Sequence, residues 1–287
     1  MRKIRILGTG VPTMDIYPAH KEMFPGGNEY NIACNVALLG EEAGFLGVFA
    51  RDLAAGYLQD TLKNLGVDMC ACRREKGSSG YSLVELKEDG DRIFLMWNQE
   101  GAADKNPIQF TEEELQYIET FDVLCAGRCA NVSREKIEML SNRGIKVCYD
   151  FYEVFTEKEI KEMAPYIHYG FFSCSHLDDE KTKSVLRSAV EAGCKIAIGT
   201  RGTQSAFAYD GKNYYEQDVN AVAAKDALGA GDSFIAAFLV SYLKDQDVQR
   251  ALKMATEYAA EIVMKSGSIG VGFHFDPPKL EELVDLS

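Results

Sequence analysis

Residues 226–234 read Asp-Ala-Leu-Gly-Ala-Gly-Asp-Ser-Phe, and the apolar run 235–243 follows directly. The run predicts an apolar helix, and the glycines before it predict a tight turn. Gly229 and Gly231 permit backbone torsions that a Cβ would forbid, so successive N–H groups can converge on one point. The positive end of the helix dipole adds to them. The stretch therefore predicts an anion site that contains one carboxylate, Asp232.

These groups match the needs of phosphoryl transfer, which are alignment, charge neutralisation and one proton acceptor. The amides of Gly229, Ala230 and Gly231 would stabilise the moving phosphoryl oxygens, and Asp232 would accept the proton of an attacking hydroxyl. The alternative interpretation is a glycine-rich turn in which Asp232 is an ordinary N-cap.

A second motif near the N-terminus favours the first interpretation. Residues 25–33 read Pro-Gly-Gly-Asn-Glu-Tyr-Asn-Ile-Ala, and the apolar run after them ends at Leu39-Gly40. The two motifs, far apart and in this order, resemble the signatures of the PfkB (ribokinase-like) sugar kinases. The resemblance implies a ribokinase-like α/β fold, with ATP and Mg²⁺ as cofactors.

Strand-like runs alternate with helical patterns along most of the chain. Strands are expected at 4–8, 43–48, 123–126, 146–150, 169–173 and 195–200, and helices at 29–39, 55–65, 135–143, 160–164, 181–192 and 247–265, the last stopped by Gly267-Ser268. Such alternation builds a mainly parallel sheet flanked by helices, with ligands at the carboxyl ends of its strands. We expect a single α/β domain over residues 1–287.

Residues 77–97 interrupt this alternation. The strand-like stretches 82–86 and 92–97 flank the turn 87–91, with no helix between them. Together with residues 11–23 they are expected to form a small antiparallel sheet. The resemblance implies that this sheet is a lid over the sugar and often a dimer contact. The alternative is a plain surface hairpin.

Sugar recognition needs paired hydrogen-bond donors and acceptors, which Asp carboxylates and Asn amides provide. The resemblance implies such contacts at Asp15, Gly26, Gly27, Asn28 and Asn31. Gly26 and Gly27 would let the main chain approach the ligand. Asn31 is alternatively a polar surface residue.

Two further residues, one at the end of the hairpin and one after it, complete this expected site. Trp97, the single tryptophan, either stacks on the sugar or packs the lid. Glu100, together with Asp15, would give the site an acidic mouth that tolerates an ammonium group on the substrate.

The nucleotide side follows from the resemblance. Besides Gly229 and Gly231, the implied ATP contacts are Thr200 and Gly202, with Thr256 and Gly267 near adenine.

The sequence offers two sets of candidate metal ligands, and each has an alternative interpretation. The family commonly organises Mg²⁺ with Asn-x-x-Glu, but residues 173–180 lack the Asn. Asp178 or Glu180 would substitute through water, unless both belong to an exposed acidic helix start. Asp226 is either a loop-fixing acceptor or a ligand of a monovalent cation such as K⁺, and the Thr that usually follows it is Ala227 here.

The substrate class is narrowed by residues 14–18, 26–28 and 100–104, which resemble the fructoselysine 6-kinases. These enzymes phosphorylate the 6-hydroxyl of an Amadori compound. A sugar-phosphate acceptor would require a cluster of basic side chains. The hairpin offers mainly Arg92, with the Arg73-Arg74 pair nearby. The alternatives are a fructose or 2-keto-3-deoxysugar kinase, or a non-catalytic sugar sensor on the same fold.

Composition excludes several other classes. The formal net charge of −13 argues against a nucleic-acid partner. No apolar run approaches the roughly 20 residues of a membrane span, and the N-terminus resembles a first strand rather than a signal peptide. A dinucleotide-dependent oxidoreductase would need Gly-x-Gly-x-x-Gly after the first strand, where residues 8–13 have Pro12 instead. We expect a cytoplasmic enzyme with a sugar and ATP as partners, and with a homodimer through the lid.

Overall fold

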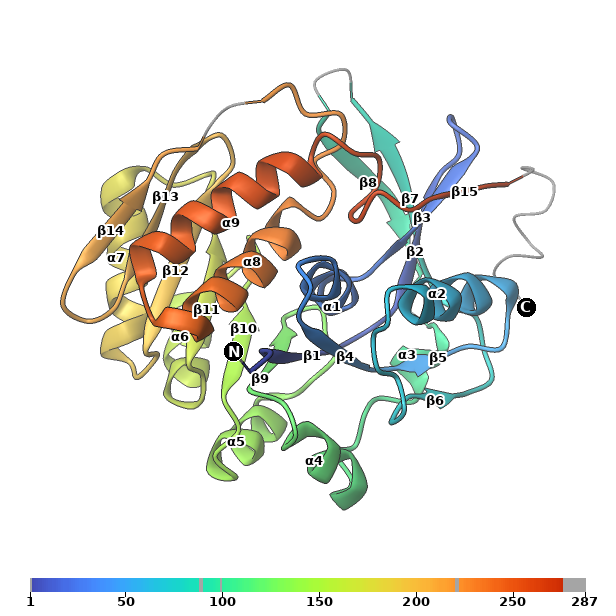
Figure 1. Ribbon diagram of the computed structural model, residues 1–287, viewed down its shortest axis with the longest axis horizontal. Helices are drawn as coiled ribbons and strands as arrows, with labels where there is room; N and C mark the ends of the chain where they lie inside the picture. Colours follow the sequence, from blue (N-terminus) through green and yellow to red (C-terminus); the bar gives the residue numbers. More distant parts are fainter. Residues whose placement is uncertain (1, 88–89, 99, 220–221, 276–287) are drawn as a thin grey trace.

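The computed structural model describes residues 2–87, 90–98, 100–219 and 222–275. Within them an eight-stranded sheet lies beside a five-stranded sheet, with helices on both faces of the larger one (Figure 1). The order of the larger sheet is β14 (Tyr214–Gln217), β13 (Gln204–Tyr209), β12 (Ile196–Arg201), β11 (Tyr169–Ser173), β10 (Val147–Asp150), β9 (Val123–Gly127), β1 (Arg5–Thr9) and β4 (Glu42–Leu46). From β4 to β12 neighbouring strands are parallel, and β13 and β14 add an antiparallel edge.

Successive residues of the parallel strands alternate between two hydrophobic cores. Ile6 and Cys125 belong to one core, whereas their neighbours Leu7 and Leu124 belong to the other. This alternation has the period of two that a β-strand imposes. Both faces of the sheet are therefore covered by helices, as expected for parallel strands.

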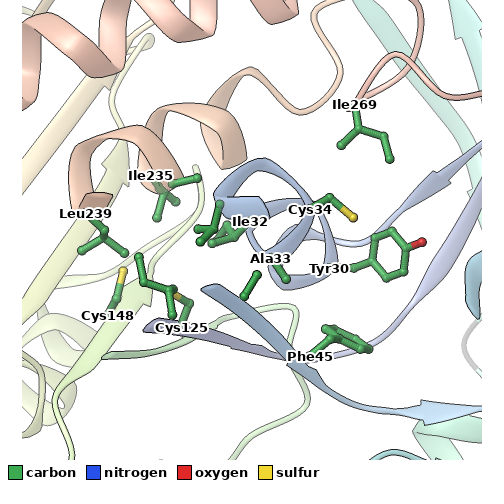
Figure 2. Packing of buried hydrophobic residues seen from close by; sticks show 14 of the residues in the cluster. Tyr30, Ile32, Ala33, Cys34, Phe45, Cys125, Cys148, Ile235, Leu239 and Ile269 are labelled. Atoms are coloured by element: carbon green, nitrogen blue, oxygen red, sulfur yellow. The ribbon is translucent and has the colours of Figure 1, made fainter. Parts of the chain in front are cut away.

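The first core lies under three helices, α1 (Asn28–Leu38), α8 (Ala230–Asp245) and α9 (Val248–Ile262). Figure 2 shows Ile32 of α1 and Leu239 of α8 packed beside Cys125 of β9 and Cys148 of β10, on the face of the sheet that these helices cover. The second core lies under α4 (Glu112–Ile118), α5 (Arg134–Asn142), α6 (Glu157–Met163) with the 3-10 turn η1 (Ala164–Tyr166), and α7 (Asp179–Glu191). The expected α/β architecture with a mainly parallel sheet is confirmed.

The five-stranded sheet has the order β15 (Phe273–His274), β3 (Glu22–Gly26), β2 (Thr13–Tyr17), β7 (Gly80–Leu86) and β8 (Arg92–Trp97). It contains the expected hairpin β7–β8 and the expected N-terminal strands. Two features differ from the expected small antiparallel sheet. The central pair β2–β7 is parallel, because a long crossover through the main domain joins the two strands. The short strand β15 also adds the C-terminal part of the described chain to its edge.

Smaller elements connect the two sheets. They are α2 (Leu53–Asn64), the strand pair β5 (Val48–Phe49) and β6 (Arg73–Arg74), and α3 (Ala102–Lys105). Asp52 begins α2, because its carboxylate accepts a hydrogen bond from the N–H of Ala55. The same carboxylate accepts hydrogen bonds from the N–H and hydroxyl of Ser79 at 2.6 and 2.7 Å. Asp52 thus ties the start of α2 to the residue before β7.

The expected end of the last helix is wrong. Helix α9 ends at Ile262 rather than 265, so Gly267 does not stop it. Gly267 has a φ of 67° and lies against Phe24, where an added Cβ would stand 2.3 Å from the ring. The glycine is therefore required by a close approach of two loops rather than by a helix terminus.

Among the described residues, none of the helices combines the length and apolar character needed to cross a membrane.

Candidate active site

Two cavities open beside the carboxyl ends of the parallel strands. One, of about 500 Å³, lies between the five-stranded sheet and α1, and we name it the carboxylate cavity. Its acidic lining residues are Asp15, Glu29, Asp104, Asp150 and Asp232. The other, of about 530 Å³, lies against α8, α9 and the end of β12, and we name it the α9 cavity.

The two cavities meet at a shared wall. Gly231, Arg92, Phe94, Tyr152 and Ser173 line both of them. A ligand in one cavity can therefore come close to a ligand in the other at this wall. The first turn of α8 forms part of it, because Gly231 is the second residue of that helix.

Asp232 lies in the first turn of α8 and is 8% exposed. The side-chain amide of Asn31, in the first turn of α1, donates a hydrogen bond to its Oδ2 at 2.8 Å. Burial raises the pKa of Asp232 to about 7, and the negative charge of Asp150 adds to the shift, while the Asn31 hydrogen bond and Arg92 oppose it. A carboxyl group with this pKa can take up a proton near neutral pH.

The turn before Asp232 is shaped by its two glycines in different ways. Gly229 is the N-cap of α8 with a left-handed φ of 74°, and an added Cβ would stand 2.4 Å from that of Ser268. Gly231 has open space where a Cβ would be. The N–H of Ala230 donates to the carbonyl of Ala227 at 3.3 Å, so this amide has a partner inside the turn. The N–H groups of residues 231 and 232 belong to the first helical turn, which leaves such groups without an intrahelical acceptor.

Asp15 lies on β2 and is 4% exposed. Its carboxylate fits only because Gly26 on the neighbouring strand has no side chain, since a Cβ there would stand 2.0 Å from Oδ2. Burial raises the pKa of Asp15 to about 7, against the effect of a hydrogen bond with Ser82 and the charge of Arg92. Gly27 next to this pair has a φ of 104°, which strongly favours glycine.

Asn28 and Asp150 form a second polar pair in the carboxylate cavity. The amide of Asn28 is 3.4 Å from Oδ2 of Asp150, and the N–H of Tyr152 donates to Oδ1 at 2.9 Å. Asp150 ends β10, and burial raises its pKa to about 6 against these two hydrogen bonds. Asn31 is also part of this network, because its Oδ1 accepts from the hydroxyl of Ser268 at 2.7 Å. The residues of the two sequence motifs are thus brought together.

Arg92 is the one cationic side chain among the described residues that line the carboxylate cavity. Its Nη1 donates to the carbonyl of Ala227 at 3.1 Å, and its guanidinium lies 5.6 Å from the ring centroid of Phe94. Strand β8 therefore places a positive charge on the wall between the cavities.

The α9 cavity combines a polar end with an apolar side. Thr200 and Gly202 line it at the end of β12, and Thr256 lines it from α9 together with Ala260 and Val263. Such a combination suits a ligand with an anionic group and an aromatic base. Arg201, between the first two, is 6% exposed and forms an ion pair with Asp179 at 2.8 Å.

Several predicted site residues lie elsewhere. Gly267 lines neither cavity, and Glu100 is exposed beside Lys105 at 3.6 Å. Asp178 is the exposed N-cap of α7 and accepts from the N–H of Lys181, while Glu180 is 90% exposed in the same first turn. Trp97 does line the carboxylate cavity, with 58% of its surface exposed.

Asp226 is buried and accepts three hydrogen bonds. Its Oδ1 accepts from the N–H of Leu228 at 2.9 Å, and its Oδ2 from the hydroxyl of Tyr17 at 3.0 Å and from the N–H of Gly267 at 2.8 Å. These bonds join the turn before α8, strand β2 and the segment after α9. The geometry matches the loop-fixing interpretation of Asp226.

Glu29 and Asp150 were not singled out in the sequence. Asp150 could have been found as the acidic residue that ends a parallel strand, where ligands gather. Glu29 gave no such signal, because a glutamate in the first turn of a helix is common for electrostatic reasons.

The sequence matches the description "pfkB family carbohydrate kinase" over residues 9–272. It is 31% identical to the fructosamine kinase FrlD of Bacillus subtilis (strain 168), with 97% of this chain and 96% of that protein covered. It is 26% identical to the fructoselysine 6-kinase of Escherichia coli (strain K12), with 89% and 95% covered.

Solved structures show the same fold. The Arabidopsis thaliana ribokinase complexed with ribose and ATP superposes with a TM-score of 0.77 at 18% identity, covering 94% of this chain and 95% of that one. The fructokinase of Xylella fastidiosa with bound ATP gives 0.74 at 19% identity, covering 93% of each chain.

Proposed function

The chain belongs to the pfkB family of carbohydrate kinases, and on that basis we propose that it transfers the γ-phosphoryl group of ATP to the 6-hydroxyl of fructoselysine or a related Amadori compound. The observation that supports this most strongly is the position of Asp232. It lies buried at the start of α8, next to the wall where the two cavities meet. The sugar would occupy the carboxylate cavity and ATP the α9 cavity.

Asp232 is the proposed general base. Its carboxylate takes the proton of the acceptor hydroxyl as that oxygen attacks the γ-phosphorus. A new O–P bond forms, the bond from the γ-phosphorus to the β–γ bridging oxygen breaks, and ADP leaves. Asn31 holds the carboxylate in place through its 2.8 Å hydrogen bond.

The transferring group would be stabilised at the shared wall. The N–H of Gly231, the positive end of α8 and the guanidinium of Arg92 all lie there and favour negative charge. The open space at Gly231 lets a phosphoryl group approach the backbone. Gly229 acts indirectly, because its left-handed conformation directs the chain into the helix.

Two carboxylates on either side of the shared wall fit a magnesium ion that arrives with the nucleotide. The described residues contain no cluster of three or more His, Cys, Asp or Glu side chains able to hold a metal. Mg²⁺ usually keeps several waters and takes one or two carboxylates plus phosphate oxygens. Asp150, which lines the carboxylate cavity, and Glu153, which lines the α9 cavity, would hold it. When bound, Mg²⁺ neutralises charge on the phosphates.

We also propose that the chain is one domain in which residues 11–23 and 77–97 supply a lid, that it dimerises through this lid, and that it works in the cytoplasm. Strand β8 lies at the edge of the five-stranded sheet and exposes a row of large apolar side chains. They are Ile93, Leu95, Met96 and Trp97, with 43% to 58% of their surfaces exposed. Light scattering of the wild type and of Leu95→Glu tests the dimer, because the added charge would prevent such an interface.

The proposed substrate is tested by measuring ADP release with a panel of acceptors. The panel contains fructoselysine, related Amadori compounds, fructose, ribose, ketodeoxygluconate and adenosine. We expect the highest kcat/KM with an Amadori compound. A clear preference for fructose or for ketodeoxygluconate would replace the proposed substrate with that sugar and leave the kinase assignment intact.

A further inference from the structure

Glu29 is a buried carboxylate that the proposed phosphoryl transfer does not use. It lies in the first turn of α1, lines the carboxylate cavity and is 1% exposed. Its Oε1 has no hydrogen-bond partner among the described residues. Burial raises its pKa well above the ordinary value against the effect of a backbone hydrogen bond, and the charges of Asp150 and Asp232 act in the same direction as burial.

Two glycines make room for this side chain. An added Cβ at Gly10, just after β1, would stand 2.2 Å from Oε2 of Glu29, and one at Gly127, the last residue of β9, would stand 2.9 Å from Oε1. The carboxylate thus lies between the carboxyl ends of two neighbouring parallel strands. This is the region of an α/β sheet where ligands bind.

A structural role explains the position poorly. A glutamate in a first helical turn does interact favourably with the helix dipole, but it can do so from the surface. Burial of a carboxylate without a partner is costly, so buried carboxylates in folded proteins are normally paired. The groups around Glu29 do not provide a counter-charge, since Asp150 and Asp232 are acidic as well.

The acidic lining of the whole carboxylate cavity also favours a ligand with a positive charge. Five acidic residues line it and Arg92 is the one cationic side chain among the described lining residues. Arg92 already donates to the carbonyl of Ala227. With a neutral sugar these buried carboxyl groups keep their raised pKa values and are partly protonated, whereas a sugar with an ammonium group would stabilise their charged form.

We propose that Glu29 is a specificity-determining residue that forms an ion pair with the secondary ammonium of the substrate, whose N–H donates to Oε1. The inference rests on the proposed function. In an Amadori compound the ammonium is attached to C1, at the opposite end of the sugar from the 6-hydroxyl. Asp232 and Glu29 would therefore engage the two ends of one molecule.

The test compares wild type with Glu29→Gln, which keeps the size of the side chain and removes its charge. Glu191→Gln is the matched control, because Glu191 is exposed at the end of α7. Kcat/KM and the dissociation constant are measured with fructoselysine and with fructose, which lacks the ammonium. Removal of one partner of a buried ion pair should lower kcat/KM for fructoselysine at least about 30-fold. For fructose the change should stay below about threefold, and the control should match wild type on both sugars.

Thermal melting without ligand separates this role from a structural one. If Glu29 only stabilised the start of α1, loss of its charge would lower the melting temperature. Because Glu29 is buried beside other acidic groups and its Oε1 has no partner among the described residues, we expect Glu29→Gln to melt at the same temperature as wild type or higher at pH 8.

The possible outcomes separate a failure of the ion pair from a failure of the proposed function. A wild type that prefers fructoselysine, together with a Glu29→Gln variant that keeps the preference, overturns the ion pair alone. An equal loss on both sugars also overturns it. A wild type that phosphorylates fructose and no Amadori compound shows that the proposed function is wrong, and the ion pair is then wrong with it.

Discussion

At the scale of single residues, the site depends on carboxylates that are held away from water. Asp15, Asp150 and Asp232 are each less than a tenth exposed, and each has its pKa raised by burial to about 6 or 7. Asn31 and Asn28 support two of them with amide donors. Near neutral pH such groups are present in both protonation states, whereas an ordinary exposed carboxylate is almost fully ionised.

Asp232→Asn should remove the proposed base while keeping the shape of the side chain. We expect kcat to fall by about 10² to 10⁴. For wild type, kcat/KM should rise with pH through about 7, because Asp232 must lose its proton before it can accept another. The residual activity of the variant should lack this rise. Rates that are unchanged in Asp232→Asn for every acceptor would show that the mechanistic assignment is wrong.

The two glycines at the start of α8 should respond differently to alanine. At Gly231 a methyl group meets open space, so Gly231→Ala should fold with a stability within about 1 kcal/mol of wild type or above it. Its activity should fall strongly, because the methyl group would stand where the phosphoryl group approaches.

Gly229→Ala is the matched comparison. The left-handed φ of 74° and the 2.4 Å approach to Ser268 should make it less stable by about 2 kcal/mol or more. Urea denaturation and ADP release on both variants provide the measurements. A destabilised Gly231→Ala with normal activity per folded molecule would contradict the role given to residue 231.

At the scale of elements, the site depends on carboxylates whose hydrogen bonds connect the elements around it. Asp226 joins the turn before α8 to β2 and to the segment after α9. Asp52 joins α2 to the residue before β7. These hydrogen bonds fix the five-stranded sheet, and with it Arg92, relative to the first turns of α1 and α8.

Asp52→Ala should weaken the connection between α2 and β7. It removes the N-cap of α2 and leaves the N–H and hydroxyl of Ser79 without their acceptor. We expect a loss of about 2 to 3 kcal/mol in the free energy of unfolding. KM for the sugar should rise more than kcat falls, since β7 lines the cavity proposed for the sugar and supplies no group to the proposed proton transfer. Equal losses of kcat and kcat/KM would instead indicate that Asp52 acts on the transfer step.

At the scale of the whole molecule, the buried carboxylates connect function to stability. In the unfolded chain their pKa values return to about 4. A carboxyl group with a raised pKa in the folded state stabilises the fold below its unfolded pKa. That contribution is lost as the pH rises through the folded pKa. The ligand-free protein should therefore lose part of its stability between about pH 4 and 7.

Asp15→Asn isolates one of these contributions. Its free energy of unfolding, relative to wild type, should increase from pH 4 to pH 8 by an amount on the order of 4 kcal/mol, because the amide has no charge to bury. Asp60→Asn, at an exposed position of α2, is the control and should show no such trend. Urea denaturation at several pH values measures the difference. A flat difference for Asp15→Asn would mean that its carboxylate is not costly to bury.

The sequence predicted the features that follow from local pattern. The alternation of strands and helices predicted the parallel sheet. The two glycine motifs led to Asp232 and Asn31, and the family resemblance they carry implied Asp15. Features that depend on contacts between distant segments were missed. The short strand β15 needs β3 as its partner, and Gly267 is a glycine because Phe24 lies against it rather than because a helix ends there.

The same reason explains the missed residues of the site. Glu29 is acidic in a first helical turn, which local pattern interprets as a dipole effect, and only the folded chain shows that it is buried between two strand ends. Asp178 and Glu180 show the reverse case. Their sequence allowed either water-mediated metal ligands or an exposed acidic helix start, and both residues lie in an exposed helix start outside the two cavities.

The pairing of β15 with β3 has a consequence for the way the protein is made. Residues 273–274 close the edge of a sheet whose other strands are complete by residue 97. During synthesis residues 273–274 leave the ribosome long after the other strands of this sheet have emerged. The edge of β3 therefore stays unpaired until then, and a protein that lacks residues 273–274 would keep the same edge open after folding.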